Sequence, residues 1–213
     1  MRRVRVLIFA LVIVPVQLLA QVDTMWVVYS PSLELASGIY RDFKEFRMNK
    51  PGILPDDLVD ERGVPIGDLR THEGEVLVRT HQGTTVPLDL DDLWGYSARG
   101  VVFLRFEDRF FRIGWMGSLA HVLLERTVTD MNMMWDPYGP RTYTVESQFV
   151  LDMSTGRLLP FNEVTLERAL LRDAVLHDEF LALNKKQKRK DEVLFGFLRR
   201  FNERNPLLFP LLP

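Results

Sequence analysis

Residues 93–119, LWGYSARGVVFLRFEDRFFRIGWMGSL, decide the fold that the sequence predicts. The stretch holds two of the four Trp residues, and apolar runs lie on both sides of the acidic pair Glu107–Asp108. Two strand-like runs joined by a short turn are typical of a β-hairpin. We therefore expect this stretch to form the centre of an antiparallel sheet, and nothing in it indicates catalytic chemistry.

A two-residue turn at the acidic pair would fix which residues of the hairpin face each other. Cross-strand partners share a face of the sheet, and successive residues alternate between its faces. One face is then apolar and is expected to face the core, through Val102, Leu104, Phe106, Phe111, Ile113 and Trp115. The other face pairs Phe103 with Arg112. It also pairs Arg105 with Phe110, which allows guanidinium groups to stack on rings. We expect the C-terminal helices to cover this Phe–Arg face.

The composition indicates a folded chain with a core of its own. The protein has 213 residues, of which 46% are hydrophobic. A chain of this length buries roughly 70% of the surface that it exposes when unfolded. The net charge of −2 does not indicate nucleic-acid binding, which is typical of strongly basic chains. The chain has no cysteine, which excludes thiol catalysis, Fe–S clusters and cysteine zinc sites.

Residues 1–20 have the three parts of a secretory signal peptide. The basic start MRRVR is followed by an apolar run, and cleavage is expected between Ala20 and Gln21. The apolar run is shorter than the ~20 residues that span a bilayer, so an uncleaved anchor is the second interpretation. Cleavage would leave 24 of the 27 basic side chains beside 29 acidic ones, a net charge of −5. We expect a protein that is periplasmic or secreted, without a stable membrane span.

Strand-like runs continue on both sides of the central hairpin. Apolar or alternating patterns predict strands at 22–29, 75–80, 84–88, 121–129, 142–151 and 157–161. Asp42 is expected to cap a short helix within 41–49. Residues 53–74 are rich in Pro, Gly and Asp, and they are expected to form a loop.

The pattern becomes helical from Asn162 onward. Asn162, Asp173 and Asp191 each precede an apolar stripe with helical spacing, which predicts three capped helices. Strands followed by helices define the α+β class, here an antiparallel meander sheet, with a barrel-like sheet as the alternative, and a bundle of about three helices. The expected parts are the signal peptide 1–20, a mainly β domain with one short helix (21–161), and a helical subdomain packing on the sheet (162–213).

Several short motifs follow one another along the chain. They are Gly38-Ile39-Tyr40, Asp42-Phe43-x-Glu45-Phe46, Asn49-x-Pro51, Leu93-Trp94-Gly95-Tyr96, Phe111-Arg112-Ile113-Gly114, Leu151-Asp152-x-x-Thr155-Gly156 and Phe201-Asn202-Glu203-x-Asn205-Pro206. In this order they resemble a family of exported proteins of Bacteroidetes bacteria, and the likeness spans most of the mature chain. That family has no assigned activity, so the resemblance implies export and architecture but no catalytic residues.

The sequence offers few groups for catalysis or metal binding. His121 and Glu125 have the spacing of ligands on a helix, but their segment predicts a strand. Asp89, Asp91 and Asp92 match only part of a calcium loop. We therefore expect no catalytic motif, no metal and no cofactor. A pair of carboxylates far apart in sequence, as in glycoside hydrolases, stays an open alternative.

Four aromatic residues are candidates for ligand binding. Trp135 and Tyr138 lie in WDPYGP, a stiff loop of the kind that presents rings to sugars or peptides. The alternative is that these rings fold back over the sheet. Trp94 and Tyr96 are expected to share one face of a strand, either as a stacking platform or as part of the core.

Two further surface features have two interpretations each. The run KKQKRK at 185–190 is either a contact for an anionic partner or membrane, or a solvated helix end. The apolar tail from Leu207 is either a docked terminus or a ligand for a partner.

Two classes of function follow from these features. The first is an exported, non-enzymatic binding or structural module of the cell envelope, with an envelope protein or glycan as partner. The alternative is a hydrolase that acts on glycans through two carboxylates about 5–10 Å apart in a cleft.

Overall fold

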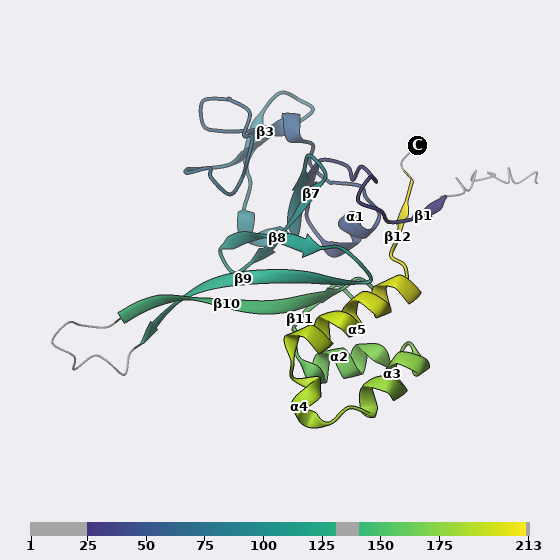
Figure 1. The fold of residues 1–213 in the computed structure, drawn as a ribbon. Coiled ribbons are helices and arrows are strands. Elements are labelled where there is room, and N and C mark those ends of the chain that lie inside the picture. The colour runs from purple at the N-terminus through teal and green to yellow at the C-terminus, as the bar shows by residue number, and fades with distance from the viewer. Residues whose placement is uncertain (1–24, 131–140, 212–213) are drawn as a thin grey trace, which may run out of the picture.

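The computed structural model describes residues 25–130 and 141–211, which form a seven-stranded antiparallel sheet with flanking elements (Figure 1). The strand order is β11-β10-β9-β8-β7-β6-β2, so β6 to β11 form a meander. The strands are β2 (Gly38–Tyr40), β6 (Gly95–Ala98), β7 (Val101–Phe106), β8 (Arg109–Trp115), β9 (Leu119–Asp130), β10 (Arg141–Asp152) and β11 (Arg157–Pro160). The predicted α+β class is confirmed. The described strands leave β2 and β11 as separate edges, so the sheet is open and the barrel-like alternative is wrong.

The β7–β8 hairpin has the predicted register. Phe103 faces Arg112, and Phe106 faces Arg109 across the turn. Glu107 supplies the turn with a positive φ of 55°. The expected apolar face is buried in the main core through Val102, Leu104 and Ile113.

Trp115 departs from the predicted face. The pairing of β8 with β9 shifts between Ile113 and Trp115, which is the signature of a β-bulge. Trp115 therefore packs on the opposite side of the sheet, against the core of the C-terminal helices. There the guanidinium of Arg199 lies 5.9 Å from the centre of its ring.

The main core lies on one face of the sheet, beneath α1 (Phe43–Arg47) and a two-stranded ribbon. The ribbon pairs β1 (Trp26–Val28) with β12 (Leu208–Pro210), so the two ends of the described chain lie side by side (Figure 1). Tyr40, Phe46 and Phe209 are fully buried in this core. The C-terminal tail is thus docked, as one of its two interpretations predicted.

The C-terminal helices cover the other face at β9, β10 and β11. They are α2 (Glu163–Leu170), α3 (Ala174–Leu181), α4 (Lys185–Lys188) and α5 (Asp191–Arg204). The predicted caps Asn162 and Asp173 accept hydrogen bonds from the backbone N–H groups of Thr165 and Leu176. Asp191 is instead the first residue of α5, and Lys190 occupies the cap position. The short helix α4 was not predicted.

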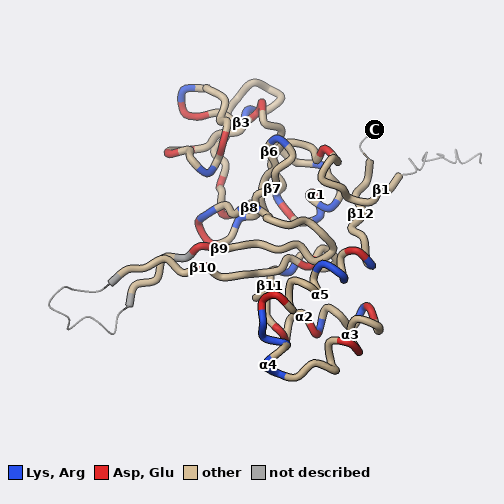
Figure 2. The backbone as a smooth tube through the Cα atoms, in the orientation of Figure 1, with Lys and Arg blue, Asp and Glu red and all other residues tan. Residues whose placement is uncertain are grey.

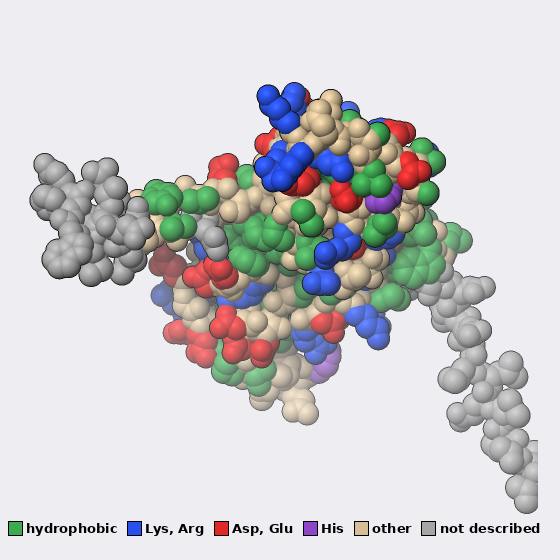
Figure 3. All heavy atoms as spheres, turned by 90° about the horizontal axis from the view of Figure 1, so that it is seen from below, with side chains coloured by type: hydrophobic (Ala, Val, Ile, Leu, Met, Phe, Trp, Pro, Cys, Tyr) green, Lys and Arg blue, Asp and Glu red, His purple; other side chains and the backbone are tan. Residues whose placement is uncertain are grey.

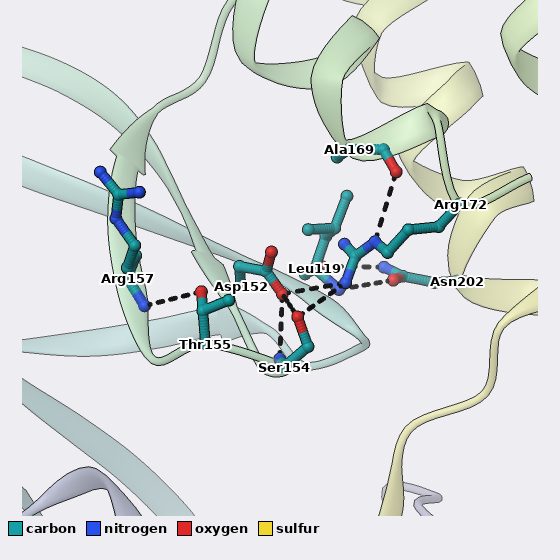
Figure 4. A network of polar contacts seen from close by, with 8 residues as sticks. All are labelled: Leu119, Asp152, Ser154, Thr155, Arg157, Ala169, Arg172 and Asn202. Atoms are coloured by element: carbon teal, nitrogen blue, oxygen red, sulfur yellow. Dashed lines mark hydrogen bonds and ion pairs between the residues drawn. The ribbon is translucent and has the colours of Figure 1, made fainter.

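Two polar contacts tie the helices to the sheet (Figure 4). The Asn202 side chain on α5 donates from Nδ2 to the Leu119 carbonyl and accepts the Leu119 N–H at Oδ1, both at 2.9 Å. Arg172, after α2, donates to Asp152 at 3.1 Å and to Ser154 at 2.9 Å. These contacts join the turn regions at the ends of β9 and β10 to the helical layer.

A small lobe, residues 53–93, covers β2, β6 and β7. It contains η1 (Pro55–Asp57), β3 (Leu58–Val59), β4 (Leu77–Arg79), β5 (Thr85–Pro87) and η2 (Leu90–Asp92). Leu58, Leu69 and Val76 of the lobe pack with Tyr96 and Phe103 of the sheet. Phe103 and Phe110 of the Phe–Arg face therefore pack against the lobe, while Arg112 is exposed, and the prediction of helical cover is wrong. Neighbouring strands of a sheet are usually rotated by roughly 20–25°, which turns β7 away from helices seated on β9 to β11.

Candidate functional site

Two neighbouring chambers that share lining residues, together called the cleft, lie where the lobe meets β2, β6 and β7. One chamber, here called the polar chamber, has a volume of about 600 Å³, and the neighbouring apolar chamber has about 340 Å³. Both volumes fall within the range of roughly 300–1,000 Å³ that is usual for small-molecule sites. The chambers share the walls formed by 65–67, Tyr96, Ala98 and Arg99.

The two chambers differ in their lining. The titratable and hydroxyl side chains of the polar chamber are Asp60, Asp68, Arg70, Thr71, His72, Tyr96 and Arg99. The apolar chamber is lined mainly by Ile39, Pro55, Leu58, Pro65, Ile66 and Leu69. Acidic residues outnumber basic ones along the lobe, and both kinds are seen on its backbone (Figure 2). The cleft therefore offers charged groups at one end and aliphatic groups at the other.

A network of Tyr96, Asp68 and Arg70 links the sheet to the lobe. The Tyr96 hydroxyl donates to Asp68 Oδ1 at 2.8 Å. Arg70 donates to the same carboxylate from Nη2 at 2.6 Å and from Nε at 3.1 Å. The Arg70 guanidinium also lies 4.3 Å from the centre of the Phe103 ring. A bidentate pair and a stacking contact together hold Arg70 in one orientation.

The network fixes the charge states of its members. Hydrogen bonds from Arg70 hold the pKa of Asp68 well below its usual range, and the bond from Tyr96 adds to this. Burial raises the pKa of Tyr96, and the hydrogen bond to Asp68 raises it further. At neutral pH Asp68 is therefore a carboxylate and Tyr96 is a neutral donor.

Asp60 is the second carboxylate of the polar chamber. Its Oδ1 accepts the backbone N–H groups of Val64 at 2.8 Å and Arg62 at 2.9 Å. Both bonds lower the pKa of Asp60, and the bond from Val64 has the larger effect. Asp60 thus stabilises a turn of the lobe and stays ionised.

Tyr96 and Trp94, two of the sequence candidates, lie in different environments. Tyr96 lines both chambers, but only 4% of it is exposed, because its ring stacks on Phe103 at 4.8 Å and meets the edge of Phe110. Trp94 points into the main core and stacks on Phe46 at 4.4 Å. Trp94 precedes β6, and its backbone N–H is shared between the carbonyls of Tyr40 at 3.1 Å and Arg41 at 3.2 Å, an irregular pairing, so regular strand alternation does not extend to it. The two rings form no common platform.

The remaining sequence candidates lie outside the described residues. These are Trp135 and Tyr138 in the proline-rich loop, and Ala20 and Gln21 at the expected cleavage point.

His121 and the Asp89–Asp92 run have structural partners. His121 lies on β9, where its Nε2 is 3.3 Å from Gln148 Oε1 and its ring packs against Phe161 and Phe195. Burial lowers the pKa of His121. Asp89 accepts the N–H of Asp91 at the start of η2, and Asp91 pairs with Arg105. Over residues 25–130 and 141–211 no group of three or more His, Asp and Glu side chains is placed to hold a metal ion.

The basic run at 185–190 is largely used in ion pairs. Lys188 pairs with Glu167 at 3.0 Å, and Arg189 pairs with Glu163 at 2.8 Å. Figure 3, viewed from the side of the helices, shows basic and acidic side chains next to one another on this face. Asn184 and Gln187 form a capping box at the start of α4. This arrangement favours the interpretation of a solvated helix end over an anion-binding patch.

The fold and cleft define an open-sheet α+β protein with a ligand-sized cavity beside the sheet edge. Compared with protein-family models, curated proteins and solved structures, the chain has no significant match.

Sequence patterns did not reveal this cleft. Asp68 and Arg70 lie in the segment that the sequence predicts as a loop, and Arg99 lies in the turn between β6 and β7. Only Tyr96 was a candidate. The available signal was the turn-forming pair Gly67–Asp68, which does not by itself indicate what the turn packs against.

Proposed function

We propose that the protein is an exported, non-enzymatic binding module that takes a small molecule into the cleft between lobe and sheet. The observation that carries this proposal is the Tyr96–Asp68–Arg70 network, which stands beside a cavity of about 600 Å³. The network orients a guanidinium before any ligand arrives. Binding sites gain affinity from such preorganisation, because less conformational entropy is lost on binding.

The alternative, a hydrolase with a dispersed carboxylate pair, is less well supported by the cleft. A glycoside hydrolase needs one carboxyl group with a raised pKa that donates a proton to the leaving group. The pKa values of Asp60 and Asp68 are both lowered, by their hydrogen bonds above all. Two permanently ionised groups supply charge and orientation but no general acid.

Export is supported by the composition of residues 1–20, a basic start and an apolar run before Ala20. Among the described residues no helix is long and apolar enough to cross a membrane. A partner in the cell envelope, and kinship with exported Bacteroidetes proteins, belong to the same proposal.

The test of the cleft uses a residue that can be enlarged without strain. Gly67 lines both chambers, and a Cβ placed on it meets no atom within 4 Å. We expect Gly67→Phe to occupy the cleft while the protein keeps its fold, measured by circular dichroism and thermal unfolding. A fragment library screened by NMR should give hits on the wild type that disappear in this variant.

The matched control is Gly196→Phe, at an exposed position of α5 that also has open space around its Cβ. Hits should persist in this control. Fragment hits that survive in Gly67→Phe, or a wild type that binds nothing at the cleft, would contradict the proposed function.

A further inference from the structure

The cationic side chains of the polar chamber bond other groups of the protein through only some of their hydrogen-bond donors. Arg70 bonds Asp68 through Nε and Nη2, which leaves Nη1 without a partner among the described residues. Arg99 lines both chambers, and the described part of the chain offers its guanidinium no hydrogen bond or ion pair. His72 adds a further ring nitrogen, 3.3 Å from the Glu75 carbonyl oxygen.

The position of Arg99 is fixed by its turn. Arg99 and Gly100 join β6 to β7 with φ angles of 52° and 74°. Two successive residues with positive φ are typical of a tight type I′ turn, whose backbone matches the twist of the strands. The turn holds Arg99 at the boundary between the polar and apolar chambers.

The two carboxylates of the polar chamber are already supplied with donors, whereas Asp56, which lines the apolar chamber, is exposed. Asp68 accepts bonds from Tyr96 and Arg70, and Asp60 accepts two backbone N–H groups. A ligand that enters the polar chamber therefore meets guanidinium groups with donors to spare. Guanidinium groups match carboxylates and phosphates, which accept two parallel hydrogen bonds.

The aromatic rings at the cleft do not offer a face for sugar stacking. One face of Tyr96 is covered by Phe103, and Arg70 lies over the Phe103 ring. The apolar contact area lies instead in the apolar chamber, where Leu58, Ile66 and Leu69 contribute aliphatic side chains. This arrangement fits an alkyl group better than a sugar ring.

We infer that the cleft binds an amphipathic oxyanion, whose carboxylate or phosphate head meets Arg99 and Arg70 and whose short apolar tail enters the apolar chamber. The inference rests on the proposed function and specifies its class of ligand. Arg99 orients the ligand, because it brings a cationic side chain to the wall that the two chambers share.

The experiment measures binding of five probes to the purified protein by calorimetry, with NMR shifts of the Gly67 and Arg99 amides to locate the site. The probes are octanoate, octyl phosphate, octanol, octylamine and acetate. Octanoate and octyl phosphate share the head charge and the tail, and their comparison distinguishes a carboxylate from a phosphate source. Octanol lacks the charge, octylamine reverses it, and acetate lacks the tail. We expect the first two to bind at least tenfold more tightly than the other three.

The variant Arg99→Gln keeps a polar side chain of similar length and removes the charge. We expect it to weaken the better oxyanion probe about tenfold or more, which is the usual effect of losing a charge-assisted hydrogen bond. Arg79→Gln, on the exposed end of β4 and outside both chambers, is the matched control and should bind as the wild type does.

The outcomes distinguish a failure of the oxyanion inference from a failure of the proposed function. Octanol binding as tightly as octanoate, or octylamine binding best, overturns the oxyanion inference and leaves the cleft a binding site. The oxyanion inference is also overturned, and the cleft stays a binding site, if neutral fragments bind there and neither oxyanion binds. If no probe and no fragment shifts the cleft amides, both the inference and the proposed function fail.

Discussion

Asp68 serves the lobe and the cleft at the same time. Its Oδ1 accepts the backbone N–H of Arg70 at 3.0 Å, which closes a turn of the lobe. The same oxygen accepts the Tyr96 hydroxyl from the sheet. One carboxylate therefore stabilises the turn of its own loop and bonds that loop to β6. Its ionisation affects the stability of both contacts.

We predict that Asp68 makes the protein less stable in acid. Its pKa in the folded chain lies below the value of about 3.9 that an unfolded chain gives. Between these two pKa values the unfolded chain binds a proton that the folded chain does not, so protonation favours unfolding. The stabilisation is complete above the unfolded pKa and is lost as the pH falls toward the folded one.

Urea unfolding at several pH values between about 6 and 2.5 would measure this effect. We expect Asp68→Asn to be less stable than the wild type near the upper pH. Its free energy of unfolding should also fall less steeply as the pH is lowered. An unchanged pH slope in this variant would show that Asp68 does not contribute.

At the scale of elements, one side chain of α5 makes two of the polar contacts between the helical layer and the sheet. Asn202 satisfies both the N–H and the carbonyl of Leu119, whose side chain is buried with the helices. Asn202→Ala leaves both backbone groups without this partner. We predict a loss of about 1–3 kcal/mol in the free energy of unfolding, measured by urea denaturation.

The control for this variant is Glu203→Ala, at the next and exposed position of the same helix. It also places an alanine in the helix, with a smaller gain in helix propensity than Asn→Ala, but it removes no contact with β9. If the two variants are equally stable, Asn202 does not fasten the helix to the sheet.

The elements that the sequence predicted well are those with local signals. The hairpin pairs Phe103–Arg112 and Leu104–Phe111 follow from strand alternation, which holds for any regular hairpin. Asn162 and Asp173 cap helices because their short side chains reach backbone N–H groups three residues ahead. Such signals need no knowledge of the remaining chain.

The elements that the sequence missed depend on distant contacts. A bulge turns Trp115 to the other face, and only the pairing with β9 reveals it. The lobe covers Phe103 and Phe110, although its strands are only two or three residues long. The cleft joins Asp68 to Tyr96, which lie 28 positions apart in a contact that no local pattern encodes.

At the scale of the whole molecule, we predict that the chain is exported and that the mature protein begins at Gln21. We expect the basic start and apolar run of residues 1–20 to engage a secretion channel, and a peptidase to cut after Ala20. Intact mass and N-terminal sequencing of protein recovered outside the cytoplasm would measure the cleavage. A chain that keeps Met1 and sediments with membranes would support the anchor interpretation instead.

The pairing of β1 with β12 has a consequence for how the chain folds. The first described strand needs the last one, and Phe209 fills the main core from the end of the sequence. Contacts between residues far apart in sequence are slow to form, because a long loop must close first. A chain that emerges with its N-terminus first, from a ribosome or from a channel, cannot complete this core until β12 has emerged. The final packing of the main core is thereby delayed until nearly all of the described chain is free.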